Sequence, residues 1–304
     1  MFGEKPRNQY RRAVIVLEDG FPFTLFGRTY DWVVLDGDGT TQYQPEAISS
    51  ELISDVATLP PPLQEACKQV ALEQSRRRAA GLFHVNNGPV LRLLSVLPGR
   101  RGLLCRPTLR VRFQPTDFYT LKTAISNHNR KLENSGGTSP QKDEWAYFTT
   151  EVILRTTDDR VVLLRRHDAL HNGGELVWAS VVACPTIADF VDGVFDITQL
   201  VKRAAEESWG VGLEAKAIRF FSIGFEQAAH HWGLLGCARI AECSADLAER
   251  RTRGVPGKGE GAEAYFVLAD PRAIAHFLRE RVDTAPSTAV ALYHAAVHWF
   301  GRKT

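Results

Sequence analysis

The order of the predicted elements after residue 144 is the feature that most limits what this chain can fold into. A hairpin of two strands turns at Asp158-Asp159, and a third strand and one helix follow it. Three more strands and two helices complete the chain. The predicted strands are 148–155, 160–166, 176–183, 218–225, 232–240 and 264–268, and the helices are 196–209, 271–281 and 286–300, with a polar loop over 244–261. This order predicts an α+β fold, an α/β/α sandwich in which helices flank a mixed sheet, and not a repeating βαβ array.

The N-terminal half predicts a separate group of elements. Short apolar runs over 13–17, 32–35, 90–97 and 109–113 predict strands, and helices are expected from residue 63 to Gly81 and from 117 to about 130. The stretch 132–144 is rich in Ser, Gly, Thr and charge, which is typical of a linker. We therefore expect an α+β extension over 1–143 and a second domain over 144–304.

Composition restricts the partners and the compartment. The formal net charge is +2, which is too close to neutral to favour nucleic acid or an anionic membrane as a partner. The five cysteines stand singly, and no apolar run approaches the roughly 20 residues of a membrane span. We expect a cytoplasmic protein that acts on a small molecule. The two terminal helices carry apolar faces that can either pack inward or form a homodimer.

The helix over 201–211 reads VKRAAEESWGV, and together with the hairpin 161–166 and Trp178 it resembles the Nudix hydrolases. The stretches 106–119 and 291–302 look similar to the extension and the last helix of bacterial Nudix-like proteins of this length. The resemblance implies a Nudix-like domain and a ligand that carries a phosphate or a diphosphate, of the nucleoside-diphosphate type.

The family box reads G-x5-E-x7-R-E-U-x-E-E-x-G-U, and this chain matches it only in part. When the box is placed on Gly210, its arginine falls on Arg203 and one glutamate falls on Glu207. Ala204 and Ser208 then stand where two further glutamates are expected. A shift by one residue restores the pair Glu206-Glu207 but puts Arg203 at a glutamate position. The box is degenerate in either register.

In the family, carboxylates at helix offsets i, i+3 and i+4 share one face and hold divalent cations that activate water. The resemblance thus implies Glu206 and Glu207 as catalytic and metal-binding residues, with Glu260 or Glu263 as a loop ligand, for weakly bound Mg²⁺ or Mn²⁺. It also implies that Arg203, Trp178, His230 and His231 contact the ligand. The competing interpretation is structural, since Arg203 and Glu207 are spaced for a helical ion pair.

Two hypotheses follow from the degenerate box. In the first, the protein recognises a phosphorylated ligand and its metal-dependent hydrolysis is lost or altered. In the second, it is an active diphosphate hydrolase that uses Glu206, Glu207 and a loop glutamate.

The stretch 33–40 offers a third hypothesis, because it resembles the first motif of haloacid-dehalogenase-type phosphatases. There Asp36 would be the nucleophile and Asp38 the acid–base partner. The same residues, Asp-Gly-Asp-Gly, are also a good turn after a strand. His294 and His298 have the spacing of a helical zinc pair, but no third ligand is evident, so we expect core or surface histidines.

Overall fold

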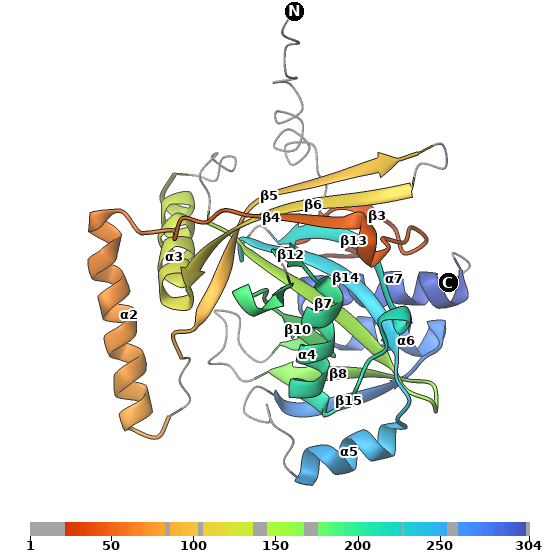
Figure 1. Cartoon of the computed structure of the whole chain (residues 1–304). Coiled ribbons are helices and arrows are strands. Elements are labelled where there is room, and N and C mark those ends of the chain that lie inside the picture. Colours follow the sequence, from red (N-terminus) through yellow and green to blue (C-terminus); the bar gives the residue numbers. More distant parts are fainter. Residues whose placement is uncertain are drawn as a thin grey trace, which may run out of the picture.

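A computed structural model describes residues 22–82, 86–102, 106–135, 145–166, 176–191, 193–226, 228–253 and 261–301. The predicted α+β class is confirmed: a mixed sheet lies between helices, and a second, smaller sheet packs beside it (Figure 1). The strand predicted over 13–17 lies outside the described residues.

The larger sheet has eight strands. Its main path runs β15 (Gly261–Leu268), β8 (Arg160–Arg166), β7 (Tyr147–Arg155), β14 (His231–Arg239), β13 (Ile218–Glu226) and β3 (Val33–Gly37), while β9 (Val177–Ala179) pairs with β8 and β10 (Val181–Ala183) pairs with β7. The pairing of β14 with β7 is parallel and the other pairings are antiparallel. The sheet is therefore mixed, as predicted.

The smaller sheet has the order β4 (Ile48–Leu52), β6 (Arg106–Asp117) and β5 (Pro89–Arg101). β5 and β6 form a long antiparallel ribbon, and β4 runs parallel to β6. The inward residues of this sheet, such as Leu109, Val111 and Phe113, are fully buried and share one hydrophobic cluster with β7 and β13. The N-terminal half thus packs directly on the larger sheet.

Helices cover both faces of the larger sheet. The helix α4 (Ile197–Trp209) packs into the same cluster as the smaller sheet, whereas α6 (Pro271–Glu280) and α7 (Pro286–Phe300) pack into a second cluster on the opposite face (Figure 1). The apolar faces of α6 and α7 therefore pack inward, including Ile274, Leu278 and Ala289.

Two further helices, α2 (Pro61–Ala79) and α3 (Phe118–Ser135), pack on each other at one side of the molecule (Figure 1). No residue of α2 is buried. Short pieces complete the fold: the pair β1 (Thr24–Leu25) and β2 (Arg28–Thr29), the pair β11 (Phe190–Val191) and β12 (Val194–Phe195), and the 3-10 turns η1 (Pro45–Ala47), η2 (Ile187–Asp189) and η3 (Ala215–Ala217).

The predicted polar loop over 244–261 is wrong in its first part, which forms the helix α5 (Ser244–Arg253). Leu247 is its one buried residue, so the helix leaves little apolar periodicity in the sequence. Polar contacts hold it instead: Arg250 donates to the carbonyl of Gly210 at 2.7 Å and to Glu242 at 3.1 Å.

The strand predicted over 176–183 is divided between β9 and β10. Ser180 stands at the division, where its hydroxyl accepts from the backbone N–H of Leu154 at 2.7 Å and donates to the carbonyl of Val162. The hydroxyl of Ser180 thus bonds to backbone groups of both β7 and β8. On either side of it, β9 pairs with β8 and β10 pairs with β7.

Residues of the extension also complete the larger sheet. β3 is an edge strand that pairs antiparallel with β13, with Asp36 opposite Ile223 and Val33 opposite Phe225. Trp32, just before it, is fully buried against Gly224 and Gly233. In the described residues no helix is long and apolar enough to cross a membrane.

Candidate functional site

The helix α4 carries the residues that resemble the Nudix box and has strong signals at both ends. Asp196 caps its N-terminus, where the carboxylate accepts from the backbone N–H groups of Thr198 at 2.9 Å and Gln199 at 3.0 Å. Gly210 ends it in the left-handed conformation with φ of 63°, which glycine adopts without steric cost. The helix therefore has the bounds that the sequence predicts.

Arg203 forms a bidentate ion pair with Asp189 of η2. Its Nε donates to Oδ1 at 3.2 Å and its Nη2 donates to Oδ2 at 3.0 Å, while Asp189 is 1% exposed. The same carboxylate accepts from the backbone N–H of Thr186 at 2.7 Å. Asp189 occupies the position of the leading glycine of the box, and it holds the guanidinium of Arg203 against the turn before the helix.

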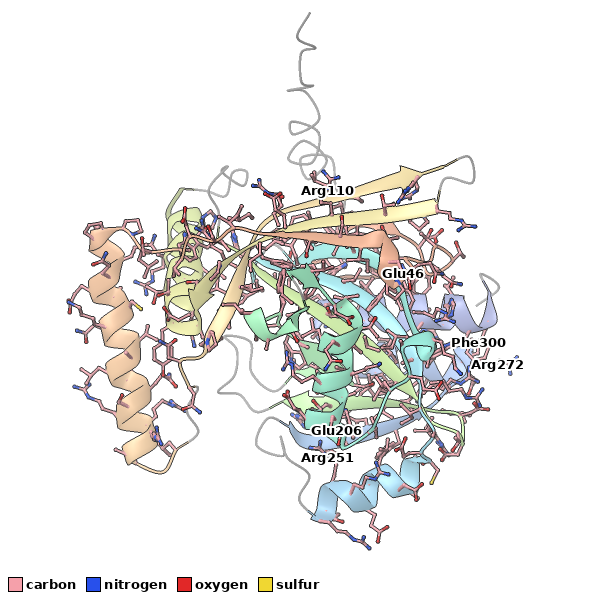
Figure 2. All side chains as sticks on the ribbon, viewed as in Figure 1. Glu46, Arg110, Glu206, Arg251, Arg272 and Phe300 are labelled. Carbon is pink, nitrogen blue, oxygen red and sulfur yellow. The ribbon has the colours of Figure 1, made fainter. Side chains whose placement is uncertain are left out.

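Glu206 and Glu207 are both exposed on the outer side of α4. Glu207 pairs with Arg203 across one turn, with Nη1 and Oε1 3.3 Å apart. Ala204 and Ala205, the residues before them, face the core. Figure 2 shows Glu206 at the end of α4 next to α5, far from the ribbon that carries Arg110.

Of the two glutamates that were candidate loop ligands for a metal, the structure describes one. Glu263 lies on β15, where it accepts from the hydroxyl of Tyr265 at 2.6 Å and lies 3.8 Å from Arg165. Glu260 falls outside the described residues. Within the described part of the chain, no three His, Cys, Asp or Glu side chains gather as a metal site.

The three remaining candidates from the sequence are buried. Trp178 lies on β9 opposite Leu164 and is 7% exposed. His230 and His231 precede and begin β14, and both are buried. Burial, followed by the charge of His128, lowers the pKa of His230 to about 4.

A polar cluster that sequence reasoning missed surrounds His231. Its Nε2 lies 3.6 Å from Oε1 of Glu151, and its Nδ1 lies 3.7 Å from Oε2 of Glu226. Thr149 also contacts Nε2, and the ring of Trp32 packs on the imidazole edge to face. The only signal in the sequence was Glu151 itself, a charged residue in the middle of a buried strand.

Asp36 and Asp38 lie in a turn that side-chain hydrogen bonds stabilise. Asp36 accepts from Nη1 of Arg100 at 2.8 Å and from the hydroxyl of Tyr43. Burial raises the pKa of Asp36, but the hydrogen bonds and charge of Arg100 and Tyr43 outweigh it and hold that pKa below its usual value. Asp38 accepts from the backbone N–H groups of Thr40 and Thr41, at 3.0 and 3.2 Å. β3 lies at an antiparallel edge, not in the parallel sheet that the phosphatase hypothesis needs.

The histidines of α7 have ordinary packing. Nδ1 of His294 lies 2.8 Å from the hydroxyl of Ser222, and burial lowers the pKa of His294 to about 4. The ring of His298 lies beside that of Phe221, with the centroids 6.2 Å apart and the planes tilted by 32°. These contacts fit the expected core and surface roles.

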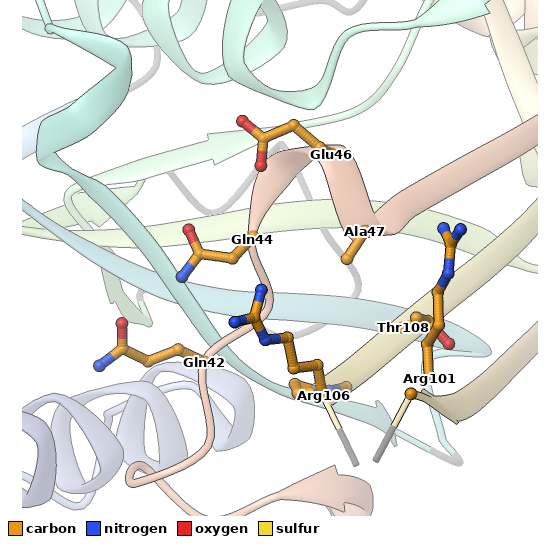
Figure 3. A pocket seen from close by; sticks show the side chains of 9 residues that line it. Gln42, Gln44, Glu46, Ala47, Arg101, Arg106 and Thr108 are labelled. Atoms are coloured by element: carbon orange, nitrogen blue, oxygen red, sulfur yellow. The ribbon is translucent and has the colours of Figure 1, made fainter. Parts of the chain in front are cut away.

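A cavity lies between the segment before β4 and the end of the β5–β6 ribbon. It measures about 800 Å³ and is open to solvent. Its lining consists of Gln42, Gln44, Glu46, Ala47, Arg101, Gly102, Arg106, Pro107 and Thr108 (Figure 3). Sequence reasoning missed it because its two walls lie far apart along the chain.

No family model matches the chain, and no curated protein matches it. Among solved structures, protein DR0079 of Deinococcus radiodurans is similar at 11% identity and a TM-score of 0.33, over 49% of this chain and 82% of that one. A bifunctional NMN adenylyltransferase/ADP ribose pyrophosphatase of Francisella tularensis, complexed with AMP and Mn, is similar at 11% identity and a TM-score of 0.33. That match covers 57% of this chain and 46% of the other. Likeness at this level carries no argument about function.

Proposed function

We propose that this protein has a Nudix-like C-terminal domain, over about 144–304, which recognises a nucleoside-diphosphate-type or other phosphorylated small molecule, and that metal-dependent hydrolysis on α4 is lost or altered. The observation that carries the proposal is the ion pair of Arg203 with the buried carboxylate of Asp189. It supports the view that the arginine of the box is kept for the fold.

The carboxylates that remain are a poor metal set. Ala204 is buried and Ser208 stands where the box has a glutamate, so the carboxylates that α4 presents to solvent are those of Glu206 and Glu207. Mg²⁺ prefers a nearly octahedral shell of oxygens, so a site with two carboxylates holds it weakly unless a substrate phosphate supplies further ligands. If Mg²⁺ or Mn²⁺ binds here, Glu206 and Glu207 would hold it, and the metal would polarise a phosphate and activate water.

Binding and hydrolysis are tested together on the full chain. Thermal unfolding is measured with inorganic pyrophosphate, ADP and a sugar nucleotide, each with Mg²⁺, with Mn²⁺ and with chelator, and release of phosphate or nucleoside monophosphate is followed by chromatography. We expect stabilisation by at least one ligand in chelator and no metal-dependent turnover. Failure of every phosphorylated ligand to stabilise the protein would contradict the proposal.

The second candidate is an active hydrolase, and the exposure of both Glu206 and Glu207 favours it. It predicts metal-dependent turnover that Glu207→Gln abolishes. Glu249→Gln is a matched control, because Glu249 is also exposed and also pairs with an arginine four residues away. Turnover that survives in Glu249→Gln and disappears in Glu207→Gln would establish the hydrolase and overturn the first candidate.

A further inference from the structure

We propose that the cavity at the end of the β5–β6 ribbon is the ligand site, and that it binds a nucleoside diphosphate through Arg101 and Arg106. The inference rests on the proposed function and deepens it, because it moves ligand recognition from α4 to a wall built by the N-terminal extension. No residue of the box lines this cavity.

Two cations stand at directly opposed backbone positions of the ribbon. Arg101 and Arg106 are direct partners in the antiparallel register, and both are exposed. Like charges directly opposite each other on two strands destabilise a sheet. No acidic side chain in the described part of the chain forms an ion pair with either arginine. An anion between the two guanidinium groups would turn this repulsion into attraction, and a diphosphate offers one phosphate to each.

The neighbouring arginine shows the contrast. Arg100 turns inward and places its guanidinium on Asp36, with Nη2 2.5 Å from Oδ1. Strand alternation then sends the side chain of Arg101 to the other side of the ribbon. Arg100 therefore holds the ribbon to β3, whereas Arg101, on the other side of the ribbon, is available to a ligand.

The opposite wall of the cavity carries both hydrogen-bond donors and hydrogen-bond acceptors. Gln42 and Gln44 both line the cavity, whereas Tyr43 between them is buried and donates to Asp36. A carboxamide donates and accepts at once, so it can match the edge of a nucleobase. Glu46 is the one acidic residue among the described residues of the lining, and its carboxylate can accept from sugar hydroxyls.

The size of the cavity and the direction of the side chains fit a nucleotide. A volume of about 800 Å³ lies within the range of roughly 300–1,000 Å³ that small-molecule sites show. Figure 3 shows Arg106 extending toward Gln44 from the ribbon, with Arg101 on the other strand and Glu46 at the far end of the wall. The described residues of the lining include no aromatic ring. The charge of the two arginines should therefore contribute to the affinity, which should fall as salt rises.

The test is calorimetric titration of the full chain with ADP and with inorganic pyrophosphate, at low and at high salt. Arg106→Gln and Arg101→Gln should each weaken ADP binding about tenfold or more, the effect of losing a charge-assisted hydrogen bond. Gln44→Ala should weaken ADP and leave pyrophosphate within about twofold. Arg110→Gln is the matched control, because Arg110 is exposed on the same face of β6 but does not line the cavity.

The outcomes separate this inference from the proposed function. If wild-type protein binds neither ADP nor pyrophosphate nor any other phosphorylated ligand, the proposed function fails and this inference fails with it. If wild-type protein binds ADP and Arg106→Gln binds it equally well, only the cavity is the wrong site. Equal losses in Arg106→Gln and Arg110→Gln would indicate attraction to net charge, and would also overturn the cavity.

Discussion

Arg203 on α4 and Asp189 on η2 are joined by paired hydrogen bonds at 3.0 to 3.2 Å, and the carboxylate is 1% exposed. An arginine that the family resemblance places in a catalytic helix thus acts as a clamp between that helix and the turn that precedes it. Substitutions in this ion pair can therefore be tested by measuring the stability of the protein as well as its activity.

Asp189→Asn should destabilise the protein by about 2–3 kcal/mol, because it removes the charge that compensates Arg203 at a buried position. Glu207→Gln is the matched change on the exposed side of the same arginine, and it should cost about 0–0.5 kcal/mol. Urea unfolding followed by circular dichroism measures both. Equal losses of stability in the two variants would show that the burial of Asp189 adds nothing to the strength of its ion pair with Arg203.

Asp36→Asn should destabilise the protein by roughly 1–3 kcal/mol, since Arg100 and Tyr43 lose their charged acceptor. Asp38→Asn should have an effect below about 0.5 kcal/mol, because an asparagine oxygen still accepts in the turn. Both variants are compared by urea unfolding and in a phosphatase assay. Phosphatase activity in the wild type that Asp36→Asn removes would support the haloacid-dehalogenase-type alternative instead.

Stability should fall as the pH is lowered from about 6.5 to 4, in part because of His294. Its pKa is lowered to about 4 in the folded protein, whereas an unfolded histidine titrates near pH 6.5. Within this window the unfolded chain takes up a proton that the folded chain does not, so unfolding becomes easier.

The contribution of His294 to this loss should be roughly 3 kcal/mol. His294→Asn preserves a nitrogen near Nδ1 for Ser222 but does not titrate. The variant should therefore lose correspondingly less stability than the wild type between pH 6.5 and 4. Parallel pH profiles of the two proteins would contradict the assignment.

Gly224→Ala should destabilise the protein by roughly 1–3 kcal/mol or more, through overpacking of the core. A Cβ at residue 224 would lie 2.3 Å from Nε1 of Trp32, whose ring is fully buried. Near-ultraviolet circular dichroism should show the displaced tryptophan. Gly212→Ala is the control, because a Cβ there meets no atom within 4 Å.

The fold was predictable where local signals are complete. Asp196 and Gly210 bracket α4 with an N-cap and a left-handed C-cap, so both ends of that helix could be read from the sequence. α5 gave no such signal, because only Leu247 of that helix is buried.

The long-range relationships were not predictable. His231 meets Glu151 because β14 runs parallel to β7, a pairing that no local pattern encodes. The same holds for the ion pair between Arg203 and Asp189, and for a cavity that is lined by residues between 42 and 47 on one side and by 101, 102 and 106–108 on the other. Residue types suggest the chemistry of a site, but the sheet topology decides which side chains meet.

The pairing of β3 with β13 also affects how the chain is made. β3 is synthesised before the strand that it must pair with, Ile218–Glu226, which follows it by almost two hundred residues. Until then Trp32 has neither Gly224 nor Gly233 to pack against. The larger sheet therefore cannot close during early synthesis, and a fragment that begins after residue 144 would expose the edge of β13 to other chains.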